Sequence, residues 1–200
     1  ASTLYHENLE AWLLEYGFKP VGADRVIFRY DRGGEKLILS LYIDDGITAT
    51  NSPALYKQFL SDLGTKFKLS NSGRLSWYLG VDIEHNKEKG ITTMSQQKYI
   101  ETLLERFHMS ECNPSPVPAT PGSRMLQMHC PAVPNKEQTK LYQQIVGGLM
   151  YAAMFRHPDI SHSVNQCTKF IMMSNPALEH IKAAKMILKY LAGTKHLKLT

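Results

Sequence analysis

The sequence predicts an α+β fold in which an antiparallel sheet with covering helices precedes a helical region. Three observations lead to this prediction. Strand-like runs of β-branched and aromatic residues cluster between residues 26 and 94, prolines accumulate between residues 113 and 135, and helical spacing of apolar residues continues afterwards. With 200 residues, 43% of them hydrophobic, the chain can bury one sizeable core or two small ones.

The first part of the chain alternates between helical and strand-like patterns. Apolar residues at helical spacing from Leu4 to Tyr16 predict an amphipathic helix, and Gly17 can take the left-handed conformation that ends it. Short apolar runs separated by Gly-rich and Asp-rich turns then indicate antiparallel strands. These strands are expected over residues 26–30, 37–43, 47–50, 77–83 and 91–94.

Two further helices are expected to cover the sheet. Ser52 and Pro53 suit the N-cap and first turn of a helix whose apolar face continues through Phe67. Residues 96–107 again place apolar side chains at helical spacing. The predicted order is therefore helix, three strands, helix, two strands and helix.

A Pro-rich segment divides the chain. Six prolines between residues 113 and 135 remove backbone donors and fix φ too often for a helix or strand. Helical patterns resume at about residues 138–155, 159–173 and 177–192. The sequence thus predicts three regions, which are the sheet with its helices at 1–107, a linker or surface strap at 108–137, and a helical region at 138–200.

Composition restricts the class of protein. The net charge of +5 and pI near 9.0 suggest a polyanionic partner without proving one. The three cysteines are odd in number and widely spaced, which fits free thiols in a reducing compartment. No apolar run reaches the roughly 18–20 residues of a membrane helix, and the N-terminus does not have the pattern of a signal peptide. We expect an intracellular protein without a membrane partner.

The motif with the most chemical content is Tyr42-Ile43-Asp44-Asp45. Two adjacent acids at a predicted hairpin tip need a compensating cation or abundant water. Mg²⁺ prefers oxygen ligands, and paired ions clamp the attacking and leaving oxygens in phosphoryl transfer. A solvated Asp-Asp-Gly turn is the simpler interpretation. The nearly continuous apolar strand that leads into the pair favours Asp44 and Asp45 as catalytic metal ligands.

Several other blocks follow one another in a specific order along nearly the whole chain. They are residues 5–9, 14–18, 41–45, 78–81, 90–91, 95–99, 142–151, 156–160, 180–185 and 190–194. In this order they resemble the reverse transcriptases of copia-type (Pseudoviridae) retrotransposons, whose Tyr-x-Asp-Asp signature matches residues 42–45. A set of blocks in this order identifies a family more specifically than the acidic pair alone does.

This resemblance implies a right-hand polymerase fold. Residues 1–107 would be a partial palm, and residues 138–200 a thumb-like or connection-like region. The activity would be RNA-directed DNA polymerisation, a nucleotidyl transfer. It requires Mg²⁺ held by three aspartates, of which Asp44 and Asp45 are two. The implied partners are an RNA template, a DNA primer, deoxynucleotides and the remainder of the Pol polyprotein, in the cytoplasm (virus-like particle) or the nucleus.

The resemblance implies that the family's first aspartate lies upstream, in a segment that we do not expect this chain to contain, and that the ribonuclease H domain expected downstream likewise lies outside it. We therefore expect a fragment that is inactive alone, because positioning and electrostatics supply most of the catalysis in phosphoryl transfer. Asp24, Asp31 and Glu35 are nearby acids, but their places in loops or at strand edges make them poor substitutes. The alternative is a decayed or co-opted, non-catalytic domain that binds nucleic acid or protein.

Weaker signals concern nucleic acid. Lys182, Lys185 and Lys189 share one helical face and either follow a phosphate backbone or form a solvated surface. Trp77 and Tyr78 either stack on bases, by analogy with the family's hairpin after the palm, or pack in a core. The candidate nucleic-acid-binding residues are Tyr42, Trp77, Tyr78, Lys182, Lys185 and Lys189.

Two further features favour structural roles. His129, Cys130 and the distant Cys112 do not have the paired spacing of a zinc site. Gly147 and Gly148 lie in a helical pattern with no preceding strand and turn, which favours close helix packing over phosphate binding.

Overall fold

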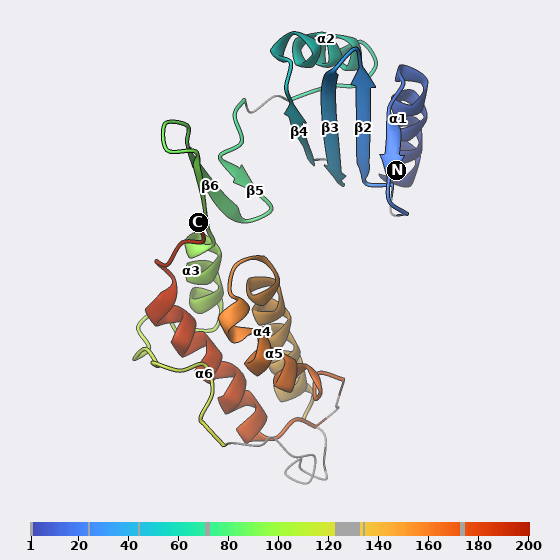
Figure 1. Cartoon of the computed structure of the whole chain (residues 1–200). Coiled ribbons are helices and arrows are strands. Elements are labelled where there is room, and N and C mark those ends of the chain that lie inside the picture. The colour runs from blue at the N-terminus through green and yellow to red at the C-terminus, as the bar shows by residue number, and fades with distance from the viewer. Residues whose placement is uncertain are drawn as a thin grey trace. The chain divides into compact units, whose positions relative to one another are not determined.

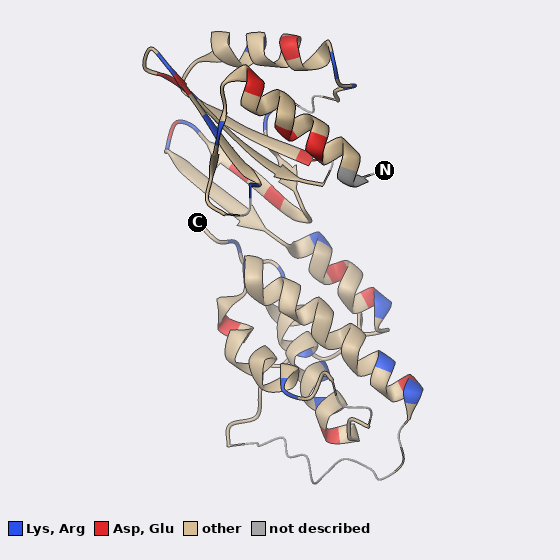
Figure 2. Cartoon of the chain, turned by 90° about the vertical axis from the view of Figure 1, so that its right-hand side faces the viewer, with Lys and Arg blue, Asp and Glu red and all other residues tan. Residues whose placement is uncertain are grey.

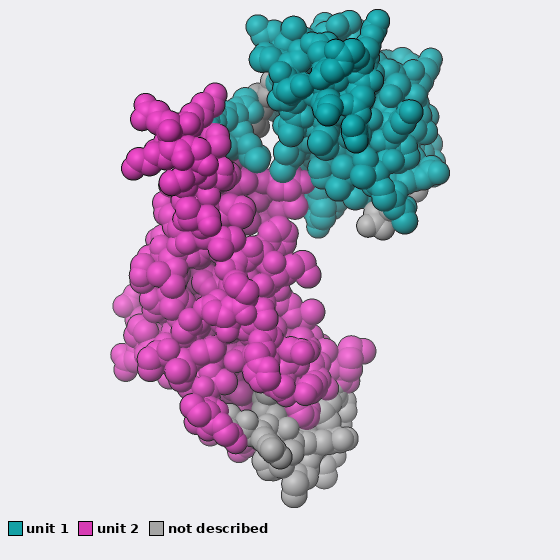
Figure 3. Space-filling model, in the orientation of Figure 1, with its two compact units in different colours: residues 1–75 teal, residues 76–200 magenta. Residues whose placement is uncertain are grey.

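A computed structural model describes residues 2–23, 25–43, 45–70, 73–122, 133, 135–172 and 175–200. The chain forms two compact units, Ala1–Leu75 and Ser76–Thr200 (Figure 3). This division falls before the predicted border at residue 107, because Ile100, Leu103 and Leu104 pack into the core of the second unit. The mixed fold with antiparallel sheets is confirmed.

The first unit is an antiparallel sheet with helices on one face. Its elements are α1 (Ser2–Tyr16), β1 (Lys19–Val21), β2 (Ile27–Arg32), β3 (Glu35–Tyr42), β4 (Asp45–Thr50) and α2 (Pro53–Gly64) (Figure 1). The strands follow the order β1-β2-β3-β4, and each pairs antiparallel with the next along the chain. The short strand β1 was not predicted from the sequence.

The covered face of this sheet holds the core of the first unit. Side chains alternate between the faces of a strand, so Phe28 on β2 and Leu37 and Leu39 on β3 all point to the same side. They are buried together with apolar residues of both helices. The helical contributions come from Leu9, Leu13, Leu55, Phe59 and Leu63.

A local cap explains where α2 begins. Ser52 has an extended backbone, and its Oγ accepts a hydrogen bond from the Leu55 backbone N at 3.2 Å. Pro53 at the first position needs no backbone partner there. The helix ends at Gly64, one turn before the predicted end at Phe67.

The second unit joins a small sheet to a helical bundle. Its elements are β5 (Trp77–Tyr78), β6 (Val81–Asn86), β7 (Ile91–Ser95), α3 (Gln97–Arg106), α4 (Lys136–Phe155), the 3₁₀ helix η2 (Pro158–Ile160), α5 (Ser161–Thr168) and α6 (Leu178–Thr194) (Figure 1). The predicted strand at 77–83 is two strands, because Leu79 and Gly80 both have positive φ (48° and 78°) and form a tight turn. Helix α5 ends earlier than predicted, at Thr168.

Helices α3, α4, α5 and α6 enclose the core of the second unit. Tyr142, Ile145 and Leu149 line the buried side of α4 and belong to one buried cluster with residues of the other three helices. Helix α3 comes so close to α4 that a Cβ added at Gly148 would lie 2.5 Å from Leu103 Cδ1. The close-packing role predicted for this glycine fits the observed contact.

Residues 113–122 contain no helix or strand and follow the surface of α6 (Figure 1). The Ser115 backbone N donates to the Lys189 carbonyl oxygen at 3.1 Å. Pro114 lies so close to Gly193 that an added Cβ there would be 3.1 Å from the proline Cβ. The rest of the predicted strap, including most of residues 123–134 with His129 and Cys130, lies outside the described residues.

A chain of polar contacts, buried at one end and exposed at the other, links α4, η2 and α6. Arg156 and His157 are buried, and Arg156 Nη1 lies 3.0 Å from His157 Nε2. His157 Nδ1 is 3.4 Å from Asp159 Oδ1, and the Tyr190 hydroxyl donates to Asp159 Oδ2 at 2.6 Å. Burial, more than the nearby Arg156 charge, lowers the pKa of His157. Burial therefore favours the neutral form of this histidine.

Candidate functional site

The acidic motif lies at the end of the hairpin formed by β3 and β4. Tyr42 ends β3 and is paired with Asp45, the first residue of β4. The predicted turn was Asp-Asp-Gly with a strand from residue 47. In the structure the strand begins earlier, so Asp45 and Gly46 belong to β4. Asp44 lies outside the described residues.

Ile43, between the tyrosine and the acidic pair, has a strained backbone. Its φ is +53°, in the left-handed region. A β-branched side chain rarely occupies this region, because Cβ then crowds the following carbonyl at a cost of about 1–2 kcal/mol. Left-handed backbone matches the twist of a tight hairpin, so the sheet holds Ile43 in this conformation. Sequence reasoning missed this feature, since isoleucine is no turn signal.

Asp45 belongs to the uncovered face of the sheet. Residues opposite each other in an antiparallel pair share a face, so Asp45 lies with Tyr42, and strand alternation adds Ile38. Tyr42 is 53% exposed and Ile38 is 44% exposed, whereas the other face is covered by α1 and α2. The first unit thus presents a carboxylate beside an aromatic ring on an open sheet surface.

The other nearby acids do not join Asp45. Asp31 and Glu35 lie at the opposite end of β3 from Tyr42, and seven steps of about 3.3 Å make that separation roughly 23 Å. Asp24 lies outside the described residues. Within the part of the chain that the structure describes, no three His, Cys, Asp or Glu side chains are grouped as a metal site. Asp45 has the oxygen donors that a hard cation prefers, but it needs further ligands.

The hairpin of β5 and β6 carries the aromatic candidates in the second unit. Trp77 is 56% exposed and Tyr78 is half-buried, so Trp77 is not packed in a core. The Tyr151 hydroxyl of α4 donates a hydrogen bond to the Leu79 carbonyl in the turn between them. Tyr151 therefore anchors this hairpin to the bundle, a role that the sequence did not reveal because 72 residues separate the two partners.

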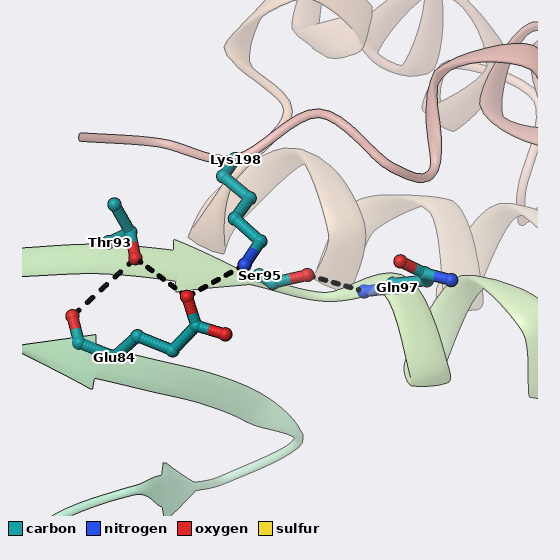
Figure 4. Close-up of polar contacts among 5 residues, drawn as sticks. All are labelled: Glu84, Thr93, Ser95, Gln97 and Lys198. Atoms are coloured by element: carbon teal, nitrogen blue, oxygen red, sulfur yellow. Dashed lines mark hydrogen bonds and ion pairs between the residues drawn. The ribbon is translucent and has the colours of Figure 1, made fainter.

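Ion pairs and the last residues of the chain support the neighbouring strands. Lys198 Nζ lies 2.7 Å from Glu84 Oε2 on β6, and Thr93 of β7 also donates to Glu84 (Figure 4). The hydrogen bond from Lys198 is the main reason that the pKa of the Glu84 carboxyl is lowered. Leu199 exchanges two backbone hydrogen bonds with Met94, at 2.9 and 3.0 Å, and so extends the sheet beyond β7.

The predicted lysines occupy the surface of α6 in the second unit. Lys182 and Lys189 are exposed and Lys185 is half-buried. Figure 2 shows basic residues distributed over this unit. Lys195 and Lys198 are paired with Glu101 and Glu84, respectively, so they contribute less net positive charge than the other three.

Comparison with known proteins decides the family. Residues 1–121, more than half of the chain, match the family described as reverse transcriptase (RNA-dependent DNA polymerase). The chain belongs to this reverse transcriptase family. The recognition made from the ordered sequence blocks is therefore confirmed.

The similarity of this reverse transcriptase chain to individual proteins extends past residue 121. It is 32% identical over 197 residues to the retrovirus-related Pol polyprotein from transposon RE1 of Arabidopsis thaliana, covering 97% of the chain. It is 34% identical over 161 residues to the Pol polyprotein from transposon TNT 1-94 of Nicotiana tabacum, covering 79% of the chain. A putative transposon Ty5-1 protein of Saccharomyces cerevisiae is 28% identical over all 200 residues.

The reverse transcriptase chain spans only part of these relatives. It covers 13% of the RE1 polyprotein, 12% of the TNT 1-94 polyprotein and 63% of the yeast protein. No solved structure matches the chain significantly. Among the described residues, no helix has the length and apolar character that crossing a membrane requires.

Proposed function

We propose that this chain supplies the two-aspartate part of the polymerase active site of a copia-type reverse transcriptase. The observation that carries the proposal is the position of Asp45, exposed at the end of a hairpin on the uncovered face of a sheet. The first unit would be part of the palm, and the helices of the second unit a thumb-like or connection-like region. The intact enzyme would be an RNA-directed DNA polymerase.

The proposed metal ligands are Asp44 and Asp45. Bound Mg²⁺ would neutralise charge that develops on the transferring phosphoryl group. Asp45 is held in place by the pairing of β4 with β3, and its exposure leaves its carboxylate accessible to a cation and to a triphosphate. Two carboxylates alone position a cation poorly, so a third carboxylate from another segment is required.

The edge of the sheet offers a place for that third ligand. Strand β4 is the last in the order β1-β2-β3-β4, and within the first unit no strand of the described residues pairs with its outer edge, which a further strand could join. A strand added there would lie beside Asp45, at about 4.8 Å in the hydrogen-bonding direction. This geometry supports a fragment that is inactive alone and becomes active with another segment of the Pol polyprotein.

Nucleic acid would contact both units. Tyr42 lies beside Asp45 on the uncovered face, and the exposed Trp77 offers an aromatic plane for a base. Tyr78 is its neighbour on β5, and the α6 lysines would bind phosphates. The proposed partners of the intact enzyme are an RNA template, a DNA primer and deoxynucleotides.

Primer extension on an RNA template with Mg²⁺ tests the proposal. The chain is compared with a longer version that includes the upstream part of its own reading frame, and each carries Asp44→Asn or Asp45→Asn as a control. We expect extension only by the longer version, and a loss of at least about 100-fold with either substitution, the effect typical of removing one electrostatic group. Extension by the short chain that Asp45→Asn abolishes would disprove the need for a third carboxylate. Full activity of the longer Asp45→Asn variant would disprove the assigned site.

A further inference from the structure

We propose that Thr120 is a phosphorylation site for a protein kinase that selects proline after the acceptor residue, and that Lys182 and Lys189 of α6 hold the resulting phosphate. The effect of this phosphorylation on nucleic-acid binding rests on the proposed function, whereas the phosphorylation of Thr120 itself does not. The argument starts from the segment of residues 113–122, which we call the strap.

The strap has no regular secondary structure that would keep its side chains from a kinase. It contains no helix or strand, and four prolines within it prevent either from forming. Thr120 is exposed and is followed by Pro121. An exposed segment that contains no helix or strand can enter an active-site cleft without the unfolding of either.

A second acceptor in the strap serves as an internal comparison. Ser115 is also followed by proline, but it is half-buried. Its Oγ donates to the Val117 carbonyl oxygen at 2.7 Å, and its backbone N is bound to the Lys189 carbonyl at 3.1 Å. Phosphorylation of Ser115 would remove the hydrogen bond from its Oγ to Val117, and Thr120 would likewise give up its contact with Met186 Sδ. The structure favours Thr120 over Ser115 as the acceptor because Thr120 is exposed and Ser115 is half-buried.

The surface beneath Thr120 is suited to a phosphate. Thr120 Oγ1 lies 3.4 Å from Met186 Sδ on α6, which fixes the position of the hydroxyl above this helix. Lys182 and Lys189 are four residues before and three residues after Met186, so they flank it on the same helical face. Both lysines are exposed and have side chains long enough to reach a group at that position. Helix α6 has a single acidic residue, Glu179, which lies in its first turn.

The chemical step is an ordinary phosphoryl transfer. Thr120 Oγ1 forms a bond to the γ-phosphorus of a nucleoside triphosphate while the bond between that phosphorus and the β,γ-bridging oxygen breaks. The nucleoside diphosphate leaves, and the hydroxyl proton passes to a base of the kinase. The product adds a charge of about −1.5 to −2 near two lysines, and so neutralises part of the basic surface of α6.

The first experiment locates the phosphate without any nucleic acid. The intact chain is incubated with a proline-directed serine/threonine kinase and ATP, and phosphopeptides are identified by mass spectrometry. We expect Thr120 to be the main site, with Ser115→Ala labelled as well as the parent chain and Thr120→Ala labelled at least about tenfold less. Labelling confined to Ser115, or none at either residue, would overturn the proposal.

The second experiment tests the lysines. The phosphothreonine is titrated by ³¹P NMR, in which its second pKa is about 6 without neighbouring charge. We expect this pKa to be lower by about half a pH unit in the parent chain, because two cations favour the dianion. The Lys182→Gln/Lys189→Gln variant should lose this decrease, whereas Lys87→Gln, in the turn between β6 and β7, should keep it. An unchanged pKa in the double variant would show that these lysines do not bind the phosphate.

The third experiment connects the modification to nucleic acid. Binding to an RNA–DNA primer–template is compared before and after phosphorylation at several salt concentrations. We expect affinity to fall about threefold to tenfold, with a shallower salt dependence, because fewer lysines remain for backbone phosphates. If the unmodified chain does not bind, the nucleic-acid part of the proposed function fails, while the first two experiments still decide whether Thr120 is modified.

Discussion

The close approach of α3 and α4 leads to a prediction about two adjacent glycines. An added Cβ at Gly148 would lie 2.5 Å from Leu103 Cδ1, closer than real Cβ contacts, whereas nothing lies within 4 Å of a Cβ added at Gly147. Leu103 is buried in the core, so its side chain has little room to move away. Alanine should therefore be tolerated at Gly147 and resisted at Gly148.

The expected difference in stability between the two alanine variants follows from two opposing effects. Alanine in place of glycine within a helix contributes about 0.8–1 kcal/mol of stability at either position. Overpacking of a filled core costs about 1–3 kcal/mol and applies only at Gly148. The propensity gain is common to both variants, so Gly148→Ala should be about 1–3 kcal/mol less stable than Gly147→Ala.

Thermal unfolding followed by helical circular dichroism measures this difference. For a unit of this size, 1 kcal/mol corresponds to a change in Tm of about 3–5 °C. Hydrogen exchange of α3 and α4 peptides should be faster in Gly148→Ala than in Gly147→Ala, which assigns the loss of stability to the second unit. In a double-mutant cycle, Leu103→Val should reduce the cost of Gly148→Ala, since it removes the atom that clashes. Equal stability of the two alanine variants would refute the packing argument.

Three other substitutions test local features. Ser52→Ala should destabilise the first unit by about 1 kcal/mol through loss of the α2 cap, measured by urea unfolding, whereas the exposed Ser61→Ala should have little effect. Ile43→Asn should stabilise the same unit by about 0.5–1 kcal/mol, because asparagine tolerates a positive φ, and a loss of stability would contradict the strain. The lowered pKa of His157 means that the unfolded chain binds its proton more readily, so stability should be complete above about pH 6.5 and fall as the pH drops below it. His157→Gln should flatten this dependence, and an unchanged slope would exclude His157 as its source.

The elements that were predicted correctly have strong local patterns. Helix α1, strands β2 and β3 and the start of α2 follow from apolar periodicity, the Gly-Gly turn and the Ser-Pro cap, all of which act between residues close in sequence. Strand β1 has only three residues, includes a proline and exposes all three side chains, so no pattern marks it. The turn at Leu79 was missed because leucine rarely takes a positive φ.

The candidate site, like the fold, could be predicted from the sequence only where local patterns determine it. The position of Asp45 at a hairpin was predictable, because an apolar strand leads directly into the acidic pair. The strain at Ile43 and the exposure of Trp77 depend on how the strands pair and on what covers them, which is information that residue types do not contain. The hydrogen bond from Tyr151 to the turn at Leu79 joins distant parts of the chain, and only the folded bundle brings them together.

The pairing of Leu199 with Met94 has a consequence for biosynthesis. Strand β7 acquires its outer neighbour only when residues about a hundred positions later have been made. At translation rates of roughly 5–20 residues per second, the edge of this strand stays unpaired on the ribosome for about 5–20 s. During that interval the nascent sheet is open to pairing with other chains, so a chaperone that shields exposed strand edges should raise the yield of folded protein.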